Sequence, residues 1–115
     1  MENIFTDEVI LDTVSKGKQY TLFLYKAGPN RDQPVEEEKK LQMAHLHFLF
    51  SLRAEGKLIL NGPVTDETDL RGIGIFNMTD KKEIEEIISR DPAVKAGRLT
   101  YEIYSWFGIP GDNLH

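Results

Sequence analysis

One histidine and one aspartate are the residues of this chain whose types and positions could support proton transfer. His45 lies in the middle of residues 35–55, where apolar residues recur at helical spacing. When this segment is wound at about 100° per residue, Leu41, His45, Phe48 and Leu52 fall on one face that looks into the core. An imidazole on such a face must either find buried hydrogen-bond partners or serve as a titratable group in a pocket.

Asp91 is the carboxylate that could hold this histidine in one orientation. It stands directly before Pro92, with Gly97 at the end of the following segment, a pattern typical of the N-cap of a short helical turn. Capping would engage the side-chain oxygens with backbone N–H groups, but the second oxygen could still orient His45, as a carboxylate orients imidazole in a triad. The sequence leaves open whether Asp91 only caps, and whether His45 is a purely structural core histidine.

Other residues are candidates for contact with a small molecule. Tyr25 lies on an aromatic segment, and Asn61-Gly62 could place an amide and exposed backbone at a pocket mouth, although such a sequence before proline is more often only a turn. Gly72 and Gly74 alternate within a predicted strand, which leaves one sheet face open for a ligand or for a closely packed aromatic ring. We therefore take Tyr25, Asn61 and Gly62 as candidate substrate-binding residues.

A metal ion or a cofactor is not expected. His47 is two residues from His45, and on a helix such residues point about 160° apart, so the two cannot share a metal ion. The chain has no cysteine, and we find neither a phosphate-binding loop nor a dinucleotide fingerprint. Any chemistry is therefore expected to use the side chains alone.

The composition is that of an acidic globular chain. Its 115 residues suffice for one domain, and a net charge of −5 argues against nucleic acid as a partner, because phosphate binding needs a basic patch. No segment approaches the roughly 18 apolar residues of a membrane span, and no signal sequence is recognised. We expect a cytoplasmic protein that has no membrane partner.

The elements that must position these residues follow the order strand, helix, strand, strand, helix, strand. The predicted strands are residues 19–27, 58–60, 72–78 and 98–107, and the predicted helices are residues 35–55 and a segment between a cap at Thr79 or Asp80 and the Asp91-Pro92 step. This order predicts an α+β, ferredoxin-like βαββαβ fold, an antiparallel sheet with two helices on one face. We expect the domain to span residues 20–107.

The two ends of the chain are predicted to lie outside this plan. Residues 1–19 are expected to form an N-terminal extension with no strong helix and at most one edge strand, over the alternating residues 9–14. Residues 108–115 are expected to form a C-terminal tail.

More apolar surface is present than one chain can cover. Met43, Leu46 and Phe50 lie about 180° from the His45 stripe, and a helix that is apolar on opposite sides is usually covered twice. The aromatic strands also offer both faces of a sheet. These features predict a homodimer or higher homo-oligomer, formed most simply by packing sheet against sheet.

Several short motifs resemble those of the YciI-like (YCII-related) family. They are Ala44-His45-Leu46, Glu55-Gly56-Lys57-Leu58, Asn61-Gly62-Pro63, and Asp91-Pro92-Ala93-Val94 with Gly97. The resemblance covers about residues 20–107 and implies a small dimeric α+β barrel in which His45 and Asp91 form the active-site pair. One branch of that family is associated with dehydrochlorination of a chlorinated hydroxyquinol, and most members have no established substrate.

Two hypotheses follow from these observations. In the first, the protein is a cofactor-independent enzyme that acts on a small cyclic or aromatic molecule, with His45 transferring a proton and Asp91 holding its tautomer. In the second, the protein is a non-catalytic dimeric module that binds a small molecule. An approach of the two side chains to about 3.2 Å beside an open cavity would favour the enzyme, and a filled core around His45 would favour the module.

Overall fold

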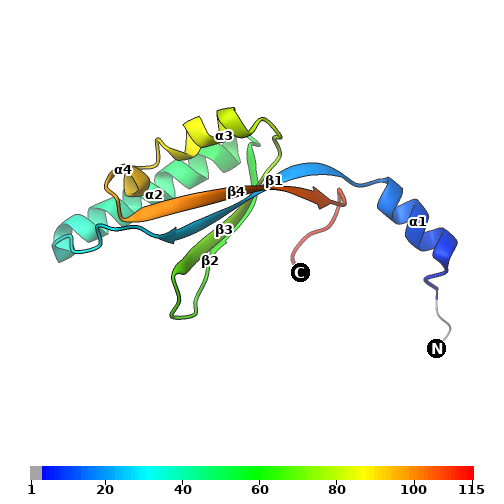
Figure 1. Ribbon diagram of the computed structural model, residues 1–115, viewed down its shortest axis with the longest axis horizontal. Coiled ribbons are helices and arrows are strands. Elements are labelled where there is room, and N and C mark those ends of the chain that lie inside the picture. Colours follow the sequence, from blue (N-terminus) through cyan, green and yellow to red (C-terminus); the bar gives the residue numbers. More distant parts are fainter. Residues whose placement is uncertain (1–3) are drawn as a thin grey trace.

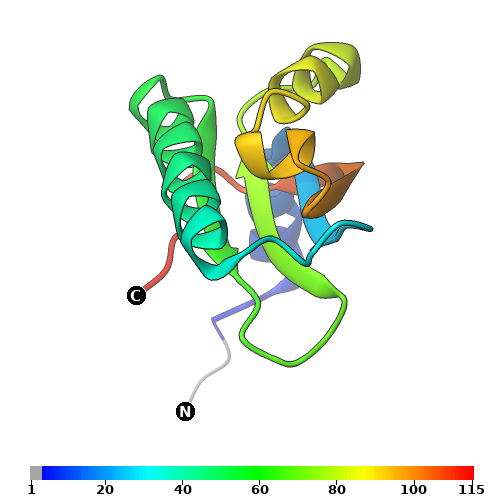
Figure 2. The ribbon, with the colours of Figure 1, turned by 90° about the vertical axis from the view of Figure 1, so that its left-hand side faces the viewer.

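The computed structural model describes residues 4–115, which form one antiparallel sheet with three helices on one face (Figures 1 and 2). The strands are β1 (Lys18–Ala27), β2 (Leu58–Pro63), β3 (Leu70–Phe76) and β4 (Leu99–Gly108), in the order β2-β3-β1-β4. The helices are α1 (Asp7–Ser15), α2 (Val35–Ala54), α3 (Lys81–Ile88) and α4 (Pro92–Lys95). Helices α2, α3 and α4 cover the sheet, whereas α1 lies beyond the start of β1, away from it. The predicted α+β, ferredoxin-like fold is confirmed.

The hydrophobic core lies between the sheet and its helices. Phe23 of β1 and Phe76 of β3 are each only 1% exposed, and they belong to one buried cluster with Leu58, Ile84 and Ile88. The two isoleucines come from α3, whose apolar residues lie along one face because they recur at helical spacing. Burial of these side chains is the main force that holds the helices on the sheet.

Local capping fixes where the helices behind the site begin. Asp80 is the N-cap of α3, and its side chain accepts hydrogen bonds from the backbone N–H groups of Lys82 and Glu83. Of the two predicted caps, Thr79 and Asp80, the helix uses Asp80. Asp91 is the N-cap of α4 and precedes Pro92, the first residue of that short helix. The chain therefore turns sharply between the two helices and carries Asp91 into the interior.

The prediction of an edge strand over residues 9–14 is wrong, because this segment belongs to helix α1. Thr6 caps the helix by accepting the N–H of Val9, Asp7 and Glu8 stand in its first turn, and Asp12 pairs with a lysine one turn later. The alternation of apolar and polar residues favours a strand, but these local helix signals prevail where no sheet edge is near. Residues 1–3 of the predicted extension lie outside the described residues.

Strand β2 is longer than predicted. Asn61-Gly62-Pro63 was expected to close the strand after Leu60, but the strand continues through Pro63, and these residues pair with β3. Strand β2 is an edge strand, so Pro63 can direct its nitrogen away from the sheet without loss of a ladder hydrogen bond. The extension matters because it brings Asn61 and Gly62 opposite the middle of β3.

The face of the sheet opposite the helices carries exposed apolar side chains. Ile73, Tyr104 and Trp106 are 40%, 45% and 40% exposed, and their strand pairing places them on this far face, since it alternates with the face that carries Phe23. The C-terminal residues Ile109–Leu114 approach one end of this face, where they and Trp106 line a shallow hollow. The rest of the far face is open to solvent.

Candidate active site

Three distant segments bring the candidate site residues together on the helix side of the sheet. His45 lies in the middle of α2, Asp91 stands at the start of α4, and Tyr25 lies near the end of β1. The three side chains meet because α4 packs against α2 and both helices lie on the same face of the sheet. The predicted apolar stripe of α2 therefore does face the sheet, with His45 near its centre.

Asp91 uses its two carboxylate oxygens for different purposes. Oδ1 accepts the backbone N–H of Ala93 at 2.9 Å, which is the helix cap. Oδ2 lies 2.6 Å from Nδ1 of His45 and also accepts the hydroxyl of Tyr25 at 2.6 Å. The residue is completely buried, so its oxygens are bonded by protein groups rather than by bulk water. The sequence left open whether Asp91 only caps, and the structure shows that it caps and also contacts the histidine.

The arrangement around Asp91 defines the state of the histidine ring. Because the carboxylate oxygen is an acceptor, the facing nitrogen Nδ1 of His45 carries the hydrogen and donates it. The other nitrogen, Nε2, makes no hydrogen bond, and within residues 4–115 no buried side-chain nitrogen or oxygen lacks a partner. Nε2 is therefore accessible, and its lone pair is available to a ligand in the cavity that His45 lines.

Tyr25 is locked into the same group. Burial, and then the nearby carboxylate of Asp91, raise the pKa of Tyr25 far above its ordinary value. The phenol thus stays protonated and donates to Asp91 at any physiological pH. Its ring also packs edge-on against the ring of His45, with the centroids 5.2 Å apart, so Tyr25 restrains the imidazole through both contacts.

A cavity of about 290 Å³ lies beside His45, between α2 and the sheet. Its lining is a mixture of apolar and polar residues, and the apolar side chains include Phe23, Leu41, Leu46, Leu49 and Leu99. A space of this size suits a small ring compound rather than an extended ligand. Leu46 was predicted on the opposite side of α2, but it lines this cavity, whereas Met43 and Phe50 are exposed.

The other candidate residues also border the cavity. Asn61 and Gly62 line it from β2, and the Oδ1 atom of Asn61 accepts a hydrogen bond from Arg53 at 2.8 Å. A β-carbon at Gly74 would lie 2.1 Å from the Phe23 ring, so this glycine makes room for an aromatic side chain, one of the two outcomes we considered. At Gly62 a β-carbon would meet nothing within 4 Å. The substrate-binding roles of Tyr25, Asn61 and Gly62 stay predictions.

Three arginines at the cavity were not predicted. Arg31 follows β1, Arg71 lies in β3 and Arg98 precedes β4, and all three line the cavity. They are far apart along the chain, and no motif marks any of them. They are recognised as a group only in the folded protein, where all three line the same cavity.

Metal ligands do not gather at this site. Within residues 4–115 no three histidine, cysteine, aspartate or glutamate side chains lie close enough to hold a metal ion, and His47 is exposed on the outer side of α2. No helix in this part of the chain is long and apolar enough to cross a membrane.

The fold and the buried histidine–aspartate contact define a small ferredoxin-like domain with a candidate active site between its helices and its sheet. The model of the YCII-related domain matches residues 19–107. The chain belongs to this family, as its short motifs indicated. No curated protein matches the chain.

One solved structure that the chain resembles is 5-chloro-2-hydroxyhydroquinone dehydrochlorinase from Burkholderia phenoliruptrix AC1100, in complex with 2,5-dihydroxybenzoquinone. The TM-score is 0.55 at 23% sequence identity, and the match covers 75% of this chain and 92% of the other. At this identity the likeness concerns the fold.

Proposed function

We propose that the protein is an enzyme that transfers a proton on a small cyclic or aromatic molecule without a cofactor, in an isomerisation or elimination. The observation that carries this proposal is the contact of 2.6 Å between Nδ1 of His45 and Asp91, beside an open cavity of about 290 Å³. A histidine that only filled the core would have no accessible nitrogen and no adjacent space. The ring compounds named for the similar structure fit the same class of substrate.

The proposed step uses Nε2 of His45 as the base. It takes a proton from a carbon or oxygen atom of the bound molecule, and the electron pair left behind moves into the ring system. In an isomerisation the same proton returns to another atom, and in an elimination an anion leaves instead. Asp91 is a positioning residue, since it fixes the tautomer and stabilises the imidazolium that forms.

Solvent-deuterium exchange into a panel of hydroxylated aromatic and cyclic keto compounds, followed by NMR, tests this proposal. We expect His45→Ala to slow exchange by about 10² to 10⁴-fold, the usual contribution of general acid–base catalysis. His47→Ala is the matched control, because His47 lies on the same helix but is exposed, and it should leave the rate unchanged. Equal rates for the His45 variant and the wild type would favour a non-catalytic binding module.

The role of Asp91 needs a readout that loss of stability would not mimic. In Asp91→Asn, the amide can donate to Nδ1, so the ¹⁵N spectrum of the ring should show the hydrogen moved to Nε2. A folded Asp91→Asn variant that keeps both the wild-type tautomer and the wild-type exchange rate would contradict this role.

We also propose that the protein acts as a homodimer that buries the far face of the sheet. Its support is the exposure of the apolar side chains of Ile73, Tyr104 and Trp106 on this face, because exposed apolar surface of this kind commonly marks protein interfaces. Two such faces packed together would give the α+β barrel that the family resemblance implies.

A cytoplasmic location is likewise part of the proposal.

A further inference from the structure

The cavity beside His45 is positively charged, although the whole chain carries a net charge of −5. Arg31, Arg71 and Arg98 line it, together with the uncharged polar residues Gln42 and Asn61. Among residues 4–115, no aspartate or glutamate lines the cavity. A ligand that enters it therefore meets arginine and histidine side chains, but no carboxylate.

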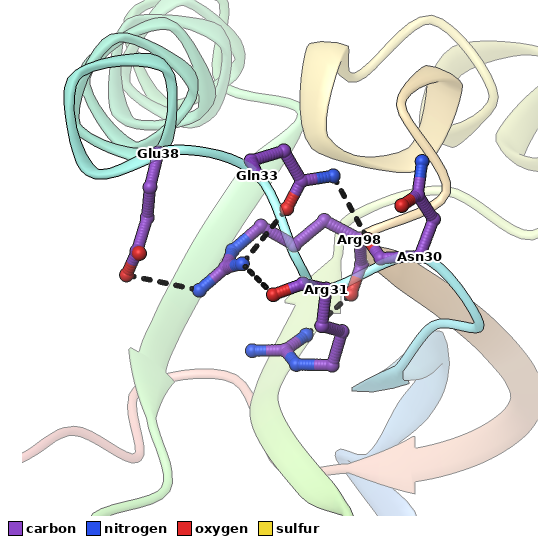
Figure 3. Close-up of polar contacts among 5 residues, drawn as sticks. All are labelled: Asn30, Arg31, Gln33, Glu38 and Arg98. Atoms are coloured by element: carbon purple, nitrogen blue, oxygen red, sulfur yellow. Dashed lines mark hydrogen bonds and ion pairs between the residues drawn. The ribbon is translucent and has the colours of Figure 1, made fainter.

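Arg98 is already neutralised by its neighbours. Its guanidinium pairs with Glu38 at 3.0 Å and donates to the side chain of Gln33 at 2.9 Å and to the carbonyl of Arg31 at 3.2 Å (Figure 3). These bonds use both terminal nitrogens. Arg98 thus serves to fix the loop after β1 and has little capacity left for a ligand.

Arg31 keeps an uncompensated charge. One terminal nitrogen donates to the carbonyl oxygen of Arg98 (Figure 3), and within residues 4–115 the guanidinium has no ion pair. Burial, and then the positive charges of Arg98 and Arg71, lower the pKa of Arg31, while Glu38 and Asp69 oppose this change only in part. The guanidinium is therefore in a net positive environment, which an anion would relieve.

Arg71 is the second uncompensated cation. Within residues 4–115 its side chain has no hydrogen bond and no ion pair. It lies at an irregularity of β3, because Tyr25 pairs with Gly72 but Lys26 pairs with Leu70, so that Arg71 has no residue opposite it on β1. A bulge of this kind releases a residue from strict alternation and often re-aims its side chain at a functional site.

We propose that Arg31 and Arg71 bind the carboxylate of the substrate, so that the enzyme acts on a small cyclic or aromatic acid. The inference rests on the proposed function, which places the reacting ring beside His45. It adds that the ring carries a negatively charged substituent. A guanidinium matches the planar, two-oxygen geometry of a carboxylate and often binds it through two parallel hydrogen bonds. The apolar walls would hold the ring, and the arginines would fix its orientation toward Nε2.

A pair of probes that differ in charge but hardly in shape tests this inference. The affinities of 2,5-dihydroxybenzoate and 2,5-dihydroxybenzamide are measured by calorimetry at low salt. We expect the acid to bind about tenfold tighter or more, the size expected for a hydrogen bond to a charged group. The preference should shrink as salt is added, because Arg71 is exposed and its charge is screened.

Variants then assign the preference to the arginines. Arg71→Gln should reduce the acid-to-amide ratio by about tenfold, and it should fold normally because the side chain makes no bond. Arg71→Lys should keep part of the ratio. Arg90→Gln is the matched control, since this exposed arginine is not part of the cavity lining, and it should change nothing. Arg31→Gln should also lower the ratio, but it additionally removes the bond to Arg98.

The outcomes separate this inference from the proposed enzymatic function. His45→Ala should abolish proton exchange and leave the acid-to-amide ratio intact, whereas Arg71→Gln should lower the ratio while the NMR signature of the His45 tautomer persists. Equal affinity of the two probes, or binding of neither at millimolar concentration, overturns the inference. Displacement of the acid by an equal concentration of inorganic phosphate also overturns it, because the site would then bind any small anion.

Discussion

The two faces of the sheet differ in which side chains they bury and which they expose. On the helix side, a fully buried carboxylate has a hydrogen-bonding partner for each oxygen, and one histidine nitrogen is accessible beside a cavity. On the far side, aromatic rings stand about half exposed, and the polar contacts include surface contacts of Glu102 with Lys26 and with Tyr104. Polar groups that are buried and completely paired impose a single geometry, whereas apolar surface imposes only that it be covered. The first arrangement suits chemistry and the second suits association.

Removal of the Asp91 side chain should cause the largest loss of stability. Asp91→Ala leaves the buried hydroxyl of Tyr25 and the N–H of Ala93 without partners, so we expect a loss of about 3–5 kcal/mol in the free energy of unfolding. Asp80→Ala is the matched control, because Asp80 is also an aspartate N-cap but is exposed, and it should cost about 1 kcal/mol. Urea denaturation measures both. Similar losses would mean that Asp91 is only a cap.

A charge on the far face should have the next largest effect, on association rather than on folding. Trp106→Asp would place a carboxylate in the proposed interface, and we expect the dimer dissociation constant to rise at least about 100-fold. Light scattering across a dilution series measures the mass. Ser89→Asp, on the helix side and exposed, is the control and should leave the mass unchanged. A wild-type chain that stays monomeric at high concentration would refute the proposed dimer.

The two faces also differ in how far the sequence predicted them. Helical periodicity placed His45 on the inner face of α2, and the Asp-Pro pattern placed a cap at Asp91, because both signals depend on residues a few positions apart. The hydroxyl contact of Tyr25 and the convergence of Arg31 and Arg71 depend on how strands and loops pack, which no local spacing encodes. The far face was anticipated only as an excess of apolar residues, because the number of such residues does not reveal which of them stay exposed.

Tyrosines on the two faces allow a closer comparison. Tyr25→Phe removes a donor to a buried carboxylate and should cost about 1.5–3 kcal/mol, whereas Tyr104→Phe removes only an exposed bond to Glu102 and should change little. Urea denaturation at neutral pH compares the two variants. A Tyr25→Phe variant as stable as the wild type would show that the hydroxyl is not needed to hold Asp91.

The pH dependence of that difference tests the same contact independently. Because the folded pKa of Tyr25 is raised, the phenol contributes stability that is complete below the unfolded pKa of about 10 and is lost as the pH rises further. The stability advantage of wild type over Tyr25→Phe should thus fall by about 1.4 kcal/mol per pH unit above pH 10. Denaturation between pH 9 and 11 measures it, and a constant difference would contradict the raised pKa.

The smallest effect, on stability and on ligand preference, should come from removal of the ion pair in which Glu38 neutralises Arg98 at the cavity. Glu38→Gln removes the carboxylate that neutralises Arg98, and since Glu38 is about half exposed the variant should lose at most about 1 kcal/mol of stability. The cavity would gain one uncompensated positive charge, so the preference for 2,5-dihydroxybenzoate over its amide should rise, by up to about threefold at low salt. Glu37→Gln is the matched control, because Glu37 is an exposed glutamate of the same first helical turn. An equal rise in both variants would indicate a diffuse field of the whole chain, whereas a rise in Glu38→Gln alone would place the anion beside the arginines.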